Sequence, residues 1–164
     1  MAGAGKVSSQ IVKKEAGPAA AKDSDLYSWA ARQAALLREG RIAEIDAAAI
    51  AEEIDDVGEE QYHRLESALR VLMHHLLKWD YQPAARARSW AIAIREQRRR
   101  ADRQLRKNPG LKARLNEALI EAYEDARDEA AKETGLPTRT FPVGIPFTFS
   151  DVMERPVVWP GDEA

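Results

Sequence analysis

The stretch HHLLKWDYQP, residues 74 to 83, gathers two histidines, a lysine, a tryptophan and a tyrosine within ten positions. Histidine is the usual proton-transfer residue near neutral pH, and lysine is a common anion ligand. We therefore take His75 as the first candidate catalytic residue, with Glu53 and Arg98 as further candidates. The candidate binding residues are Glu52, Lys78, Trp79, Gln82, Ser89 and Trp90.

Helical phase assigns different surroundings to the two neighbouring histidines. On a helix, His75 lies at the border of an apolar seam beside Leu72 and Trp79. We expect its ring to pack against Trp79 and to donate a hydrogen bond to a carboxylate or carbonyl oxygen. The opposite side of the helix is polar and is interpreted as a solvated face; it carries His63, Ser67, Arg70, His74 and Lys78.

Three enzyme chemistries use residues of these types. Arg70 and His75 match the Arg-x4-6-His pattern of HEPN ribonucleases, but their side chains point about 140° apart on an ideal helix. A di-metal bundle needs two Glu-x-x-His motifs, and the chain has one, at Glu60 and His63. A serine hydrolase needs a Gly-x-Ser-x-Gly elbow, which is missing. We predict no metal and no cofactor, and an enzyme is the less favoured interpretation.

Composition indicates a globular protein. The 164 residues are 45% hydrophobic and 32% charged, with a net charge of -2 and no cysteine. The absence of a long apolar run predicts no membrane segment, and the absence of cysteine excludes disulfides and suits the cytoplasm. The small negative charge gives no general attraction to nucleic acid.

The expected organisation is an all-α domain with short extensions. Residues 1–23 are rich in Ala, Gly, Ser and Lys, so we predict a disordered tail. Residues 24–160 form the helical domain and 161–164 its C-terminal end. Apolar spacing and capping residues predict five helices, at 24–40, 46–58, 59–79, 86–107 and 108–135, with Gly58 separating the second from the third.

The last 30 or so residues are expected to form an irregular strap across the bundle. This segment is rich in proline, which excludes a long helix. It also contains large aromatic residues whose burial would stabilise the fold, namely Phe141, Phe147, Phe149 and Trp159. A docking arm for a partner is the alternative interpretation.

Charge is distributed unevenly along the chain. Residues 86–107 contain nine basic and two acidic residues, a net of +7, whereas residues 44–60 contain eight acidic and no basic residues. The basic helix is suited to a phosphate backbone, yet the acidic stretch offers partners inside the same domain. We favour internal pairing, with Arg98 and Glu53 as the expected pair, and keep nucleic-acid binding as the alternative.

Consecutive blocks of the sequence resemble a bacterial family known as domain of unknown function number 29. The blocks include DLYSWAARQAALLREGRIAEIDAAAIAEEIDDVG, HLLKWDYQP, RSWAIAIREQRR and FPVGIPFTFSDVM. The resemblance spans about residues 25–160 and implies a helical bundle with no established activity. Its recognisable positions are Glu52, Glu53, His75, Lys78, Trp79, Gln82, Pro83, Ser89, Trp90, Arg98, Glu133 and Thr134. The family's Pro-Ser-Leu block is Pro-Gly-Leu here, at residues 109–111.

Together these patterns favour a non-catalytic interaction or regulatory module that self-associates as a homo-oligomer or binds a protein partner. The alternative is a nucleic-acid-binding protein or HEPN-like ribonuclease that uses the basic helix 86–107 with Arg70 and His75.

Overall fold

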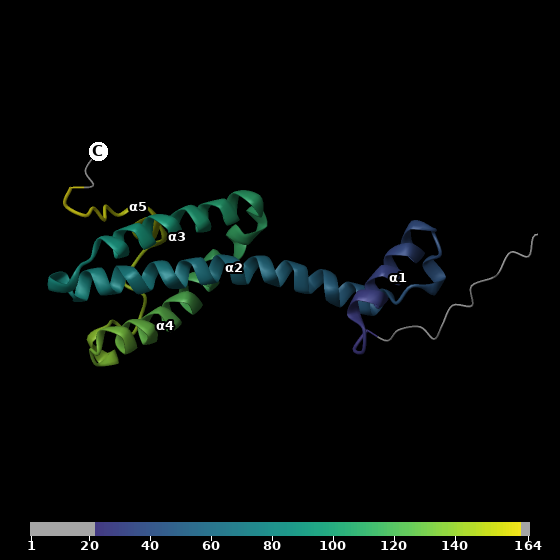
Figure 1. Cartoon of the computed structure of the whole chain (residues 1–164), viewed down its shortest axis with the longest axis horizontal. Helices are drawn as coiled ribbons and strands as arrows, with labels where there is room; N and C mark the ends of the chain where they lie inside the picture. Colours follow the sequence, from purple (N-terminus) through teal and green to yellow (C-terminus); the bar gives the residue numbers. More distant parts are fainter. Residues whose placement is uncertain (1–21, 162–164) are drawn as a thin grey trace, which may run out of the picture. The chain divides into compact units, whose positions relative to one another are not determined.

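The computed structural model describes residues 22–161, and this part of the chain is helical without strands (Figure 1). Its α-helices are α1 (Leu26–Arg38), α2 (Ala47–Tyr81), α3 (Arg88–Lys107), α4 (Leu115–Thr134) and α5 (Phe149–Glu154). The predicted all-α class is confirmed. Most of the predicted tail, residues 1–21, lies outside the described residues. Within the described part, no helix has the length and apolarity needed to cross a bilayer.

Contacts divide the described residues into two compact units, with the boundary between Ile54 and Asp55. In the first unit, Asp25 caps α1 by accepting a hydrogen bond from Ser28 N at 2.9 Å. Gln33 is buried and accepts a hydrogen bond from Asp46 N at 2.9 Å, and Asp46 in turn caps α2 through Ala49 N. The buried side chains of this unit are few: Trp29, Gln33 and Leu36.

The prediction of two helices separated by Gly58 is wrong, because α2 runs without a break from Ala47 to Tyr81. A glycine ends a helix when it adopts a left-handed conformation, as Gly40 and Gly135 do with φ of 70° and 71°. Gly58 is not among the glycines with positive φ. It therefore remains an ordinary, if unfavourable, helical residue.

The second unit is built around the C-terminal part of α2, which lies between α3 and α4 (Figure 1). Hydrogen bonds join Tyr62 to Glu121 and Arg70 to Glu129, both 59 positions apart, so α2 and α4 run in the same direction. Gln104 near the end of α3 donates to Gln61 O at 3.0 Å, so α3 runs the opposite way. The core comprises mainly leucines of α2 and alanines of α4.

The ends of α3 and α4 agree with the predicted helices to within a few residues, except at one junction. Asn108 was expected to start a continuous helix, but Pro109–Arg114 form the 3-10 helix η3 and α4 begins at Leu115. Proline at the first position suits the 3-10 turn, and Gly135 ends α4 as predicted.

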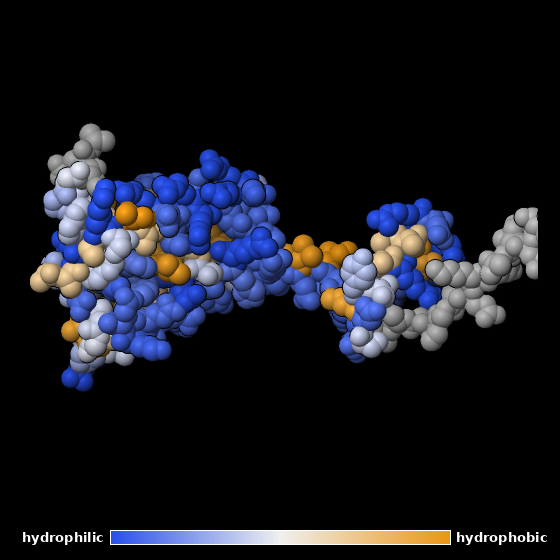
Figure 2. Space-filling model, viewed as in Figure 1, coloured by the Kyte–Doolittle hydropathy of each residue, from blue (hydrophilic) through white to orange (hydrophobic). Residues whose placement is uncertain are grey.

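The predicted strap is confirmed in the second unit. Phe141 and Phe147 are buried, and Phe149 and Trp159 pack against the core while partly exposed. Tyr123 donates a hydrogen bond to Pro142 O at 2.7 Å, which fixes the start of the strap to α4. The strap contains α5, whose capping box is formed by Thr148 and Asp151. Figure 2 shows mainly hydrophilic side chains on the visible face of this unit.

Candidate functional site

The C-terminal part of the polar stripe of α2 is not the solvated face that helical phase predicts. Lys78 is buried, with 3% of its surface exposed, and His74 is largely covered. The reason is that α4 presents its own polar stripe to this side of α2. Arg70 pairs with Glu129, and Lys78 pairs with Glu133. The part of the stripe from Arg70 to Lys78 is therefore a charged seam between two packed helices, whereas His63 is exposed.

Lys78 is held on two sides. Its ammonium group donates to Glu133 Oε1 and lies 4.3 Å from the centre of the Trp90 ring, a cation–π contact with the first turn of α3. Burial raises the pKa of Glu133, but the hydrogen bond and charge of Lys78 outweigh it and leave the pKa lowered overall. Lys78 thus links α2, α3 and α4.

His74 completes the seam as a neutral ring. Its Nε2 lies 2.7 Å from Glu133 Oε2, but no hydrogen bond of acceptable geometry forms there. Burial lowers the pKa of His74 below its usual 6.5, and the neighbouring His75 acts in the same direction. The carboxylates of Glu133 and Glu129 oppose that shift without reversing it.

His75 has a structural contact at the border of the core. Its Nδ1 lies 2.8 Å from Val71 O, one turn earlier in α2, so the ring nitrogen donates to a carbonyl as expected. The ring is partly exposed and packs 5.0 Å from that of His74. The Arg70 of the ribonuclease pattern pairs with Glu129 instead.

Arg98 binds backbone carbonyls where a carboxylate was expected. Its Nε donates to Val152 O at 2.9 Å, and its second nitrogen donates to Arg155 O at 2.8 Å. Glu53 lies in the first unit, where it pairs with Lys22 at 3.1 Å, as does Glu52 at 2.8 Å. The expected Arg98–Glu53 pair is therefore replaced by two separate contacts.

The remaining binding candidates gather mostly at the C-terminal end of α2. Arg86 covers the Trp79 ring at 4.8 Å and donates to Trp79 O at 2.8 Å. Gln82 donates to Thr134 O at 3.2 Å, which ties the ends of α2 and α4 together. Ser89 is exposed at the start of α3. These contacts, with those of Lys78, join the residues to one another, and Glu133 also lines an open hollow with His74, Glu129 and Lys132.

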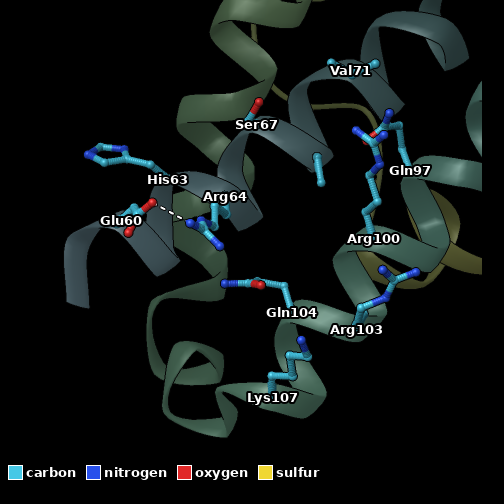
Figure 3. Close-up of a pocket in the computed structure, with 11 residues that line it drawn as sticks. Glu60, His63, Arg64, Ser67, Val71, Gln97, Arg100, Arg103, Gln104 and Lys107 are labelled. Carbon is cyan, nitrogen blue, oxygen red and sulfur yellow. Dashed lines mark hydrogen bonds and ion pairs between the residues drawn. The ribbon is translucent and has the colours of Figure 1, made fainter. Parts of the chain in front are cut away.

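Another open site is a groove of about 550 Å³ between α2 and α3 (Figure 3). We call it the α2–α3 groove. The α2 side is formed by Glu60, His63, Arg64, Ser67, Ala68 and Val71. The α3 side is formed by Gln97, Arg100, Arg103, Gln104 and Lys107.

The groove is positively charged although the chain is not. Four cationic side chains and one carboxylate line it, so its formal charge is 4 − 1 = +3 without His63, against -2 for the whole chain. Glu60 is paired with Arg64 on its own helix. Arg100, Arg103 and Lys107 are exposed and have no hydrogen bond or ion pair with another described residue.

The predicted ion pairs between the basic helix and the acidic stretch do not neutralise the cations of the groove. Glu59 and Glu60, from the acidic stretch, pair with Arg114 and Arg64, and neither of these arginines belongs to α3. On α3 itself, Arg106 pairs with Asp102 one turn away. The groove-facing cations Arg100 and Arg103 are left available to a ligand.

Sequence reasoning missed the groove because it depends on which helices lie side by side. Polar side chains recur at helical spacing on each of the two facing helices, and these spacings were the available indication of the groove. Arg100 and Arg103 recur along α3 with Lys107, and His63 and Ser67 recur along α2, each at steps of three or four. Their antiparallel pairing was not predictable from these spacings alone.

A family model described as domain of unknown function DUF29 matches residues 22–157, which confirms the resemblance found in the sequence. No curated protein and no solved structure matches the chain. Within residues 22–161, no three His, Cys, Asp or Glu side chains are placed to hold a metal ion.

Proposed function

The chain belongs to the DUF29 family, and we propose that it is a non-catalytic interaction module that binds a negatively charged partner in the α2–α3 groove. The carrying observation is the row of Arg100, Arg103 and Lys107, three cations that the described residues leave unpaired. Exposed guanidinium and ammonium groups that no carboxylate of the protein neutralises can pair with the oxygens of an external anion.

The non-catalytic part of the proposal is supported by the contacts of the candidate catalytic residues. His75 is bonded to a carbonyl of its own helix, and Arg98 fixes the strap through two carbonyls. Proton transfer or anion activation would require these groups to face a ligand. Neither side chain lines the groove.

Chromatography of the full chain on immobilised heparin, a general polyanion, tests this proposal. We expect retention at about 50 mM salt and elution well below about 200 mM, because a few ion contacts are sensitive to salt. The double variant Arg100→Glu/Arg103→Glu should elute at clearly lower salt or fail to bind.

The matched control is Arg99→Glu/Arg106→Glu, which makes the same charge change on exposed positions of the same helix outside the groove. It should shift elution much less. Circular dichroism spectra would verify that both variants keep their helices. Equal shifts for the two variants would show that charge alone, and not the groove, governs retention, and the proposal would be rejected.

Self-association and a cytoplasmic location belong to the same proposal. The lack of cysteine supports a reducing compartment. Light scattering of the purified chain tests the oligomeric state directly: a mass of one chain, 18.3 kDa, at all concentrations would rule out the homo-oligomer.

A further inference from the structure

We infer that the ligand of the α2–α3 groove is single-stranded nucleic acid, held by its phosphodiester backbone without recognition of base sequence. This inference rests on the proposed function, since it specifies the anion that the groove would bind. Three features of the groove support it: the arrangement of its cations, its position between two packed helices, and the types of side chain that line it.

The cations form a row rather than a cluster. Arg100, Arg103 and Lys107 follow one another along α3 at steps of three and four, so they extend over about 10 Å of helix at about 1.5 Å per residue. Figure 3 shows all three side chains on the α3 side of the hollow. A polynucleotide strand presents a regular series of single negative charges, which a row of cations can follow.

Neutral hydrogen-bonding side chains lie on both walls of the groove. Ser67 and His63 come from α2 and the buried Gln97 comes from α3, whereas the amide nitrogen of Gln104 already donates to Gln61. Hydroxyl and amide donors are common ligands of phosphate oxygens and sugars. A strand in the groove would thus contact the row of cations on α3, and Arg64, Ser67 and His63 on α2.

The width of the groove favours a single strand over a duplex. Neighbouring packed helices have axes only about 8–10 Å apart, and side chains occupy part of that space. A duplex carries its phosphates on the outside of a wide cylinder and admits a helix into its own major groove, which is about 12 Å wide. It cannot enter the space between two packed helices, whereas one strand can.

The groove offers no surface for stacking bases. No aromatic ring other than the imidazole of His63 is among its lining side chains, although most sequence-tolerant single-strand sites combine charge with stacking. Binding would therefore depend mainly on the backbone. The consequences are modest affinity, little preference among bases and a strong dependence on salt.

Fluorescence anisotropy with labelled oligouridylate and oligothymidylate of about 12 nucleotides tests the inference on the full chain. Three to four phosphate contacts predict a slope of log K against log salt of about −2 to −3. Arg100→Glu/Arg103→Glu should weaken binding more than about tenfold, and Arg99→Glu/Arg106→Glu less than about threefold, at about 50 mM salt. A duplex of the same length should bind more weakly than either single-stranded oligonucleotide.

The outcomes separate this inference from the proposed function. Groove-dependent retention on heparin without binding of either oligonucleotide would overturn the nucleic-acid inference and leave an anionic protein as the partner class. A preference for one oligonucleotide of more than about tenfold would contradict backbone recognition. Equal elution shifts of the groove variant and its control on heparin would contradict both the proposed function and the nucleic-acid inference.

Discussion

Lys78 Nζ lies 4.3 Å from the centre of the Trp90 ring while it donates to Glu133, so one buried ammonium group joins three helices. The two members of its ion pair differ in environment. The side chain of Lys78 is 4% exposed, and that of Glu133 is 52% exposed. Removing one or the other should therefore have unequal effects on stability.

We predict that Glu133→Ala destabilises the protein more than Lys78→Met does. Loss of Glu133 leaves a buried ammonium group without its carboxylate, which should cost about 2 kcal/mol or more of unfolding free energy. Loss of Lys78 leaves a carboxylate that water can reach, and methionine keeps the packing on Trp90, so the cost should stay below about 1 kcal/mol.

Urea denaturation measures both changes. Glu124→Ala, at an exposed position of α4, is the control and should change the free energy of unfolding by less than about 0.5 kcal/mol. The reverse order of the two effects would mean that Lys78 gains less from Glu133 than the burial of its ammonium group suggests.

A second prediction concerns the glycine inside α2. Gly58 is helical, and a Cβ added there meets no atom within 4 Å. Gly58→Ala should therefore raise the free energy of unfolding by about 0.5–1 kcal/mol, because alanine loses less conformational entropy in a helix. Gly135→Ala should lower it by about 1 kcal/mol, because φ is 71° there. A destabilised Gly58→Ala in thermal melts would indicate a bend or turn at this position.

The glycines at helix ends and inside α2 also show which parts of the fold the sequence could predict. Gly40 and Gly135 follow complete apolar patterns and end their helices through local backbone geometry, so α1 and α4 end where expected. Gly58 looks similar in sequence, but the helix continues through it. Local signals alone do not determine whether a glycine adopts the left-handed conformation.

The candidate sites were predictable to a smaller extent, because they depend on pairing between helices. The contact of His75 with a carbonyl followed from helical phase. The burial of Lys78 did not, because a polar stripe is solvated or buried according to what faces it. The i, i+4 spacing of Glu129 and Glu133 on α4 was the missing signal.

A third prediction concerns the connection between α3 and the strap. Arg98→Lys keeps the charge but loses the planar fork that reaches the carbonyls of Val152 and Arg155. We expect a loss of about 1–3 kcal/mol in unfolding free energy and faster amide exchange in α5, residues 149–154. Arg99→Lys, at the exposed neighbouring position, is the control. Unchanged exchange in α5 would show that the capping box alone holds this helix.

The last prediction is a loss of stability in mild acid that originates at His74. Its pKa in the folded protein is below 6.5, so between that pKa and 6.5 the unfolded chain binds more protons than the folded one. The contribution of His74 is complete above pH 6.5 and is lost as the pH falls through the folded pKa. The titratable groups beside His74 are Glu129, Lys132 and Glu133 from α4 and His75 and Lys78 from α2.

His74→Gln removes the titrating ring and keeps a polar side chain of similar reach. The free energy of unfolding should fall less steeply for this variant than for the native chain between about pH 7.5 and about pH 5.5. The lowered pKa of Glu133 adds its own loss of stability, but only below about pH 4.5, where its carboxylate begins to bind a proton in the unfolded chain. An equal change of the free energy of unfolding in the two proteins between about pH 7.5 and about pH 5.5 would mean that the pKa of His74 is the same in the folded and unfolded states. That result would contradict the interpretation of His74 as a neutral ring.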